Sequence, residues 1–183
     1  MAWRVFKTLL FTVLVPGTVA GWLPQWLLEE QRRAFPHHFH PSHYGGAILL
    51  AMGVAIYLWC AWEFTVTGRG TPAPIDAPRI LVVKGLYRWV RNPMYIGVLL
   101  VILGQAIFYG SRTILVYMIG VAVLFALFVR LYEEPMLRGH FGEQYEKYRR
   151  RVPRWIPRAP GKPGEGQRTQ SPANDSSGPP SIH

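Results

Sequence analysis

Two adjacent acids at the end of an apolar block are the first residues that could do chemistry. Glu133 and Glu134 directly follow the apolar block 113–132, within the stretch RLYEEP. Adjacent carboxylates at a membrane surface are poorly hydrated, so they need a cation close to them. Arg130 lies one helical turn earlier and can pair with either acid. The pattern therefore predicts an interfacial ion pair or a site that binds a cationic group.

A second candidate site is the stretch GLYRWVRNPMYIG, residues 85–97, which leads into another apolar block. If residues 86–91 form a helical turn, Arg88 and Arg91 lie on one face of it. Pro93 suits the first turn of the following helix, whose free N–H groups and positive dipole end favour anions. The two arginines are therefore predicted to bind an anion or to anchor the chain among anionic lipid headgroups.

The loop that contains this stretch, residues 67–93, is too long and too specific to be a simple connection. Its prolines restrict the backbone, and Gly85 can adopt a positive φ or let another group approach the backbone closely. The apolar run from Ile80 to Val83 gives the loop side chains to bury. We expect the loop to form one wall of a cytoplasmic pocket.

Four apolar blocks must position these candidate residues. Half of the 183 residues are apolar and only 16% are charged, compared with about 25% in soluble domains. The blocks are long enough, or nearly so, for the ~20 residues of a membrane span. We therefore expect an all-α integral membrane protein with about four transmembrane helices, over residues 5–28, 44–66, 94–110 and 113–132.

Details within the blocks predict how these helices pack. Only Ser111 and Arg112 clearly separate the last two blocks, which must therefore form a tight antiparallel hairpin. Neighbouring helices allow the Pro16-Gly17 pair to kink the first block. Small residues in the second block allow another helix to approach closely; they are Gly45, Gly46, Ala47, Ala51, Gly53 and Ala55. Glu63, near the end of that block, is either functional or snorkels to the surface.

The distribution of basic residues predicts the orientation in the membrane. Lys and Arg number 20 against 10 Asp and Glu, and most of them flank the apolar blocks. They concentrate before the first block, in the loop 67–93 and after the fourth block, which predicts a multi-pass protein with both termini and this loop in the cytoplasm. No nucleic-acid recognition module accompanies the charge, so the membrane is the expected partner rather than a nucleic acid.

The region after the fourth block is predicted to lie on the membrane surface. Phe141, Tyr145 and Tyr148 form an aromatic face opposite a basic one, which indicates an amphipathic interfacial helix over about 138–151. Residues 159–183 contain almost nothing to bury and are predicted to be a disordered tail after a single domain, 1–158.

Two further features are expected to have no ligand-binding role. Histidines cluster in PHHFHPSH, but no carboxylate or regular spacing accompanies them, so we expect a polar loop and no metal site. The cluster consists of His37, His38, His40 and His43. The single cysteine, Cys60, excludes an internal disulfide.

Taken together, GLYRWVRNPMYIG, the tight helix pair, EEPML, FGEQYEKY and VPRWIP resemble the isoprenylcysteine carboxyl methyltransferase family, part of a wider group with phospholipid methyltransferases. The resemblance covers about residues 68–157. It implies an integral membrane enzyme that uses S-adenosylmethionine. The implied cofactor-binding residues are Arg79, Ile80, Leu81, Val82, Tyr87, Asn92, Pro93, Met94, Tyr95 and Glu133.

The resemblance also implies catalytic residues. Glu133 suits the cationic groups of the cofactor, Glu134 adjoins it, and Arg130 is the nearest match to an arginine that binds substrate in relatives. This chain has Arg79 and Asn92 where relatives commonly have histidine. Because asparagine cannot titrate, an acid–base role at position 92 is not supported.

The implied activity is transfer of a methyl group to a carboxylate or other nucleophile of a lipophilic, amphiphilic or lipid-linked acceptor. A carboxylate needs no base, so alignment and electrostatics can carry the catalysis. An amine would have to lose a proton, and no histidine is among the implied positions, which favours an oxygen or thiol acceptor. The alternatives are an ethanolamine-type phospholipid N-methyltransferase, an NADPH-dependent membrane reductase of similar fold, and a non-catalytic membrane scaffold. The sequence leaves the oligomeric state open.

Overall fold

The described part of the protein is entirely helical. The computed structural model describes residues 10, 12, 14–28, 41–66 and 81–159 and contains no strand among them. Residues 160–183 of the predicted tail, residues 67–80 of the loop 67–93, and His37, His38 and His40 lie outside the described residues. An all-helical class is therefore confirmed for the described residues.

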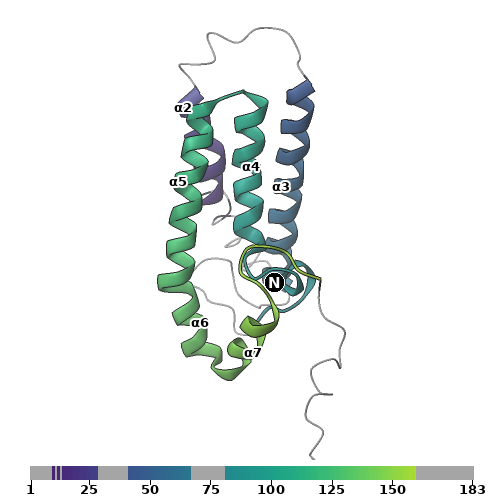
Figure 1. Cartoon of the computed structure of the whole chain (residues 1–183), viewed down its shortest axis with the longest axis vertical. Helices are drawn as coiled ribbons and strands as arrows, with labels where there is room; N and C mark the ends of the chain where they lie inside the picture. The colour runs from purple at the N-terminus through teal and green to yellow at the C-terminus, as the bar shows by residue number, and fades with distance from the viewer. Residues whose placement is uncertain (1–9, 11, 13, 29–40, 67–80, 160–183) are drawn as a thin grey trace, which may run out of the picture.

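The long helices α3, α4 and α5 stand side by side, and the short helices α6 and α7 extend beyond them (Figure 1). A π-helix, η1, and the short α2 lie beside this bundle, and a 3-10 helix, η3, precedes α4. The bounds are η1 Gly17–Trp22, α2 Leu23–Leu28, α3 Pro41–Val66, η3 Gly85–Arg88, α4 Pro93–Phe108, α5 Arg112–Phe128, the π-helix η4 Val129–Glu133, α6 Glu134–Phe141 and α7 Glu143–Arg151.

Among the residues that the structure describes, two helical segments are long and apolar enough to cross a membrane, Pro41–Val66 and Arg112–Phe141, while α4 is a shorter apolar helix. Large apolar side chains are exposed along α3 and α5, among them Ile48, Val116 and Leu124. Apolar surface of this extent marks contact with a membrane or a partner. The membrane character is thus supported, while the four spans and their orientation remain predictions.

Glycines bring α3 and α4 into backbone contact. A Cβ atom on Gly46 would lie 2.6 Å from the backbone nitrogen of Phe108, and one on Gly53 would lie 2.6 Å from the carbonyl oxygen of Gly97. A Cβ on Gly104 would meet the backbone of α3 equally closely. The predicted close approach through small residues is confirmed at Gly46 and Gly53. The facing glycines on α4 were not predicted.

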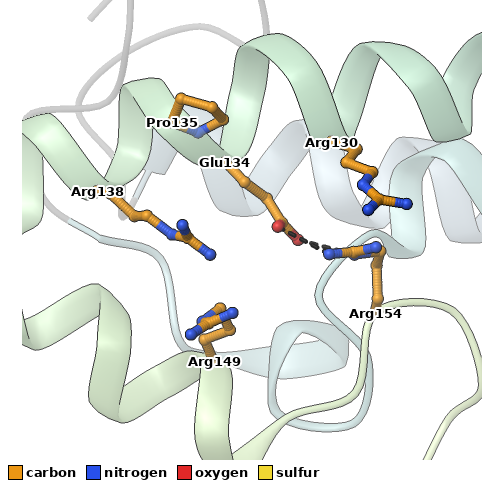
Figure 2. A pocket seen from close by; sticks show the side chains of 6 residues that line it. All are labelled: Arg130, Glu134, Pro135, Arg138, Arg149 and Arg154. Carbon is orange, nitrogen blue, oxygen red and sulfur yellow. Dashed lines mark hydrogen bonds and ion pairs between the residues drawn. The ribbon is translucent and has the colours of Figure 1, made fainter.

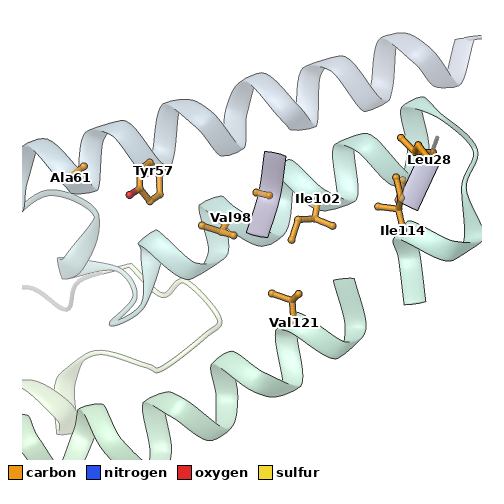
Figure 3. Close-up of a cluster of buried hydrophobic side chains, with 9 residues drawn as sticks. Leu28, Tyr57, Ala61, Val98, Ile102, Ile114 and Val121 are labelled. Carbon is orange, nitrogen blue, oxygen red and sulfur yellow. The ribbon is translucent and has the colours of Figure 1, made fainter. Parts of the chain in front are cut away.

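The predicted hairpin of the last two apolar helices is present. Gly110 adopts φ +58° at the joint, and the Ser111 hydroxyl accepts a hydrogen bond from the backbone nitrogen of Ile114 at 3.3 Å. This capping bond satisfies a free N–H group at the start of α5. The apolar core lies where this hairpin meets α3 and the first segment (Figure 3), and includes Leu28, Tyr57, Ala61, Val98, Ile102, Ile114 and Val121.

The predicted irregularity at Pro16-Gly17 takes the form of η1, which begins at Gly17. Neighbouring helices provide hydrogen bonds to carbonyl groups of this wider helix. Tyr117 donates its hydroxyl to the carbonyl of Val19 at 2.8 Å, and Gln105 Nε2 donates to the carbonyl of Ala20 at 2.6 Å. Such side-chain donors allow an irregular backbone to exist within an apolar bundle.

The predicted interfacial helix over 138–151 differs from the structure in two respects. Gly142, at φ +51°, divides it into α6 and α7. The aromatic face does not point to lipid, because Tyr145 and Tyr148 are buried within the protein and pack with Phe141, Leu137 and Val152. The side chains that looked membrane-facing in sequence are therefore part of a small internal core.

Candidate functional site

Glu134 is the centre of an ion-pair network that joins three separate parts of the chain. Its side chain is 6% exposed at the start of α6. Arg91 Nη1 lies 3.0 Å from Oε1, while Arg154 makes a bidentate pair with both oxygens at 2.8 Å. Arg91 Nη1 also donates to the Tyr145 hydroxyl at 3.3 Å. Both oxygens of Glu134 are therefore engaged by cations, which compensates its burial.

This network corrects two expectations about the arginines. Arg91 is only 10% exposed and pairs with Glu134, so it is neither a headgroup anchor nor an open anion site. Arg88 ends η3 and is exposed, so the two arginines do not share a face. Arg130 does not pair with either acid within the described residues. Instead, Tyr95 contacts Glu133, and Arg91 and Arg154 pair with Glu134. The sequence did not show that these segments lie close together.

Glu133 has a different environment from its neighbour. Its Oε2 accepts a hydrogen bond from the Tyr95 hydroxyl at 2.8 Å. The Tyr95 ring lies 4.8 Å from the ring of Phe125 and 6.4 Å from that of Trp155, measured between centroids. A half-buried carboxylate with one neutral donor, beside three aromatic rings, can bind a cationic group and a flat ring system.

The C-terminal segment 152–158 runs along the stretch that begins α4. Arg91 donates its backbone N–H to the carbonyl of Pro153 at 2.9 Å, and Asn92 Nδ2 donates to the carbonyl of Arg154 at 3.1 Å. Arg158 donates its backbone N–H to the carbonyl of Trp89 at 2.9 Å. Asn92 is buried, and its amide donates across this junction. Together these bonds fix one wall of the site.

Tyr148 adds a second tie between α7 and the same stretch. Its hydroxyl donates to the backbone carbonyl of Tyr87 at 2.8 Å. Burial raises the pKa of the Tyr148 phenol well above its ordinary value, although nearby Arg91 opposes the shift. The hydroxyl therefore remains a hydrogen-bond donor throughout the neutral pH range.

The structure gathers some of the expected cofactor positions and separates others. Asn92, Pro93, Met94 and Tyr95 are at the start of α4, and Tyr95 reaches Glu133. Tyr87 and Val82 are buried in a separate small core with Cys60. The remaining positions are Leu81, which packs against the buried tyrosines of α7, and Arg79 and Ile80, which lie outside the described residues.

Gly85 has the conformation that its residue type predicts. Its φ is +54°, and a Cβ atom there would lie 3.1 Å from Trp59 Nε1 and 3.3 Å from Glu63 Oε1. The close neighbour is thus the end of α3. Glu63 is half-buried and faces this turn, so it lies at the junction between α3 and the loop.

Two recesses adjoin the site. The larger has a volume of about 460 Å³, is lined by charged side chains and lies between α6, α7 and the C-terminal segment (Figure 2). The smaller, about 170 Å³, is apolar and lies between α3, the start of α4 and the C-terminal segment. The larger is lined by Arg130, Glu134, Pro135, Arg138, Arg149 and Arg154, and the smaller by Ile56, Leu86, Trp89, Val90, Pro93, Ile96 and Pro157.

Sequence reasoning missed Arg154, Trp155 and the partnership of Tyr145 with Arg91. The motif VPRWIP was visible, but no spacing rule relates it to a stretch so far upstream. Within the described residues no group of three or more His, Cys, Asp or Glu side chains could hold a metal ion.

Comparisons with known proteins show which family the chain resembles. The sequence profile of a family described as phospholipid methyltransferase matches residues 41–144, more than half of the chain. A Schizosaccharomyces pombe protein named protein-S-isoprenylcysteine O-methyltransferase is 35% identical over 82 residues, which are 44% of this chain. The match covers only 34% of that relative's length. No solved structure matches the chain significantly.

Proposed function

The chain belongs to the phospholipid methyltransferase family, and we propose that it is a membrane enzyme that transfers a methyl group from S-adenosylmethionine to a lipophilic or amphiphilic acceptor. The observation that carries this proposal is the corner formed by Glu133, Tyr95 and Trp155, at the ends of two apolar helices. The accepting atom is proposed to be a carboxylate oxygen or another nucleophile.

The residues of this corner fit the proposed cofactor. Within the described residues, Glu133 Oε1 has no hydrogen-bond partner, so it can accept from the ammonium group of S-adenosylmethionine. The rings of Tyr95, Phe125 and Trp155 are inclined to one another and offer apolar surfaces against which the adenine can pack.

Catalysis would depend mainly on alignment. When bound, S-adenosylmethionine supplies an electrophilic methyl group on a sulfonium. The protein's part is to hold donor and acceptor in line and to exclude water. Glu133 binds the cationic end, and the apolar recess beside Trp89 and Ile96 can take hydrocarbon from the acceptor. A carboxylate acceptor needs no general base in this arrangement.

The proposed roles of the catalytic candidates now differ from one another. Glu133 contacts the methyl donor. Glu134 has a positioning role, because Arg91 and Arg154 engage both of its oxygens and leave none for a ligand. Arg130 is exposed at the end of the α5–η4 helix and is proposed to meet an anionic part of the acceptor. Asn92 is proposed to shape the site rather than to transfer a proton.

A binding experiment tests the cofactor assignment. The full chain is purified in detergent, and binding of S-adenosylhomocysteine and of NADPH is measured for wild type, Glu133→Gln and Glu143→Gln. Glu143 is an exposed acid on α7 that pairs with Lys147, so it controls for loss of charge. We expect S-adenosylhomocysteine to bind wild type and the control, with at least tenfold weaker binding to Glu133→Gln. NADPH binding instead would support a reductase, and no binding of either would support a scaffold.

The acceptor chemistry can be tested through the product. Membranes containing the protein are supplied with S-adenosylmethionine carrying a labelled methyl group, and the labelled lipid fraction is treated with mild base. A carboxyl methyl ester releases labelled methanol, whereas an N-methylated phospholipid headgroup keeps its label. We expect base-labile label. Base-stable label in an ethanolamine-type lipid would establish the N-methyltransferase alternative.

A further inference from the structure

We propose that the larger recess binds the phosphoryl group of an anionic lipid at the membrane surface. This recess lies beside the proposed methyl-donor corner but does not include Glu133 or Tyr95. The inference does not depend on the proposed activity, because it rests on the charge, geometry and position of the recess.

The lining is strongly basic. Four arginines face one carboxylate, and that carboxylate, Glu134, is already paired with Arg91 and Arg154. Arg138 and Arg149 lie on one side of the recess, and Arg154 and Arg130 lie on the other (Figure 2). Guanidinium groups on opposite sides of one recess suit a phosphoryl group, whose several oxygens accept from more than one donor.

The arginines retain donors for such a ligand. Glu146 pairs with Arg138 through Nε at 3.1 Å and with Arg149 through Nε and Nη2. Each guanidinium has five N–H groups, so these pairs leave further Nη donors on both side chains. Arg130 has no ion-pair partner within the described residues. The recess is therefore rich in uncommitted cationic donors, while Glu146 holds two of its arginines in place.

The position of the recess favours a lipid over a soluble anion. Part of its lining, from Arg130 to Arg138, follows the apolar helix α5 without a break, since Arg112–Phe141 is one candidate span. Leu127 and Leu131 are exposed beside Arg130, with Leu131 at 71%. Exposed apolar residues followed directly by arginines place the recess at the depth of lipid phosphates, where basic side chains attract anionic headgroups.

Helix α7 supplies a matched control. Arg150 and Arg151 are exposed neighbours of Arg149 and do not line the recess. The double variants R138Q/R149Q and R150Q/R151Q remove the same charge from the same end of the molecule. A diffuse electrostatic attraction would respond equally to both, whereas a defined site responds only to the first.

The test measures equilibrium binding of radiolabelled short-chain phosphatidate to the full chain in neutral detergent. We expect R138Q/R149Q to bind at least tenfold more weakly than wild type and R150Q/R151Q to bind within twofold of it. Unlabelled diacylglycerol with the same chains should not compete, and inorganic phosphate should compete only at far higher concentration. Binding of S-adenosylhomocysteine should be unchanged in R138Q/R149Q. Circular dichroism checks folding, and R138Q alone replaces the double variant if that variant unfolds.

Four results would overturn the proposal. Equal phosphatidate binding by R138Q/R149Q and wild type would remove the site, and equal losses in both double variants would reduce it to diffuse charge. Competition by diacylglycerol would show that the chains are bound rather than the phosphoryl group. Competition by inorganic phosphate at the concentration of phosphatidate would assign the recess to a soluble anion.

Discussion

The two adjacent glutamates, identical in type, have opposite environments. Glu134 is buried, and two arginines engage both of its oxygens; Glu133 is half-buried and accepts from one neutral hydroxyl. A carboxylate whose charge is fully compensated holds segments together, and a carboxylate with a free oxygen can bind a ligand. The partners of a carboxylate, and not its residue type or its position, therefore separate a structural acid from a ligand-binding one.

The largest expected effect is a loss of stability when Glu134 is replaced. Glu134→Gln leaves Arg91 buried without its counter-ion, and breaking a buried pair in this way costs about 3–5 kcal/mol. Denaturant unfolding in detergent should show this loss of stability relative to wild type. Glu143→Gln, at an exposed acid, should unfold like wild type. If Glu134→Gln is as stable as this control, the two glutamates do not differ as the structure indicates.

Tyr148→Phe tests whether the hydrogen bond between α7 and η3 also stabilises the fold, as the Glu134 ion pairs do. The substitution removes the hydroxyl that donates to the buried Tyr87 carbonyl. Leaving a buried acceptor without a partner costs about 1–3 kcal/mol. The free energy of unfolding should fall by this amount, while the affinity for S-adenosylhomocysteine should change little. A stability equal to that of wild type would show that the Tyr148–Tyr87 hydrogen bond does not stabilise the fold.

The main prediction for Glu133 concerns binding of the cofactor product S-adenosylhomocysteine. Glu133→Gln should weaken S-adenosylhomocysteine binding by at least tenfold, about 1.4 kcal/mol, because the neutral amide cannot pair with an ammonium group. Its unfolding curve should lie close to that of wild type. Large destabilisation with unchanged binding would reverse the roles assigned to the two acids.

The smallest expected effect is that of Tyr95→Phe. It keeps the ring that packs with Phe125 and removes only the hydrogen bond to Glu133. We expect a loss of about 0.5–1.5 kcal/mol in cofactor binding, the usual contribution of one hydrogen bond. Titration with S-adenosylhomocysteine measures it, and Tyr109→Phe, a tyrosine at the far end of α4, is the control. Equal affinities for both variants would exclude a role for the Tyr95 hydroxyl.

The fold was predictable where local patterns determine it. Apolar blocks and short joints in the sequence predicted the helices, the α4–α5 hairpin and the close approach at Gly46 and Gly53, because these follow from length, hydropathy and side-chain size. The division at Gly142 was missed, since a glycine within an amphipathic pattern does not by itself end a helix. The burial of the α7 tyrosines was missed because an aromatic face looks the same whether lipid or protein covers it.

The candidate site was predictable only in its residue types. The sequence by itself determined that two acids follow an apolar helix and that Asn-Pro-Met-Tyr begins another, since both patterns are local and their resemblance to a family is specific. Only the tertiary structure decided the pairing of Glu134 with Arg91 and Arg154 and of Glu133 with Tyr95. The reason is that ion pairs and hydrogen bonds depend on which distant segments meet. The start of α4 meets the end of the α5–η4 helix, and the returning C-terminal segment brings Arg154 to Glu134.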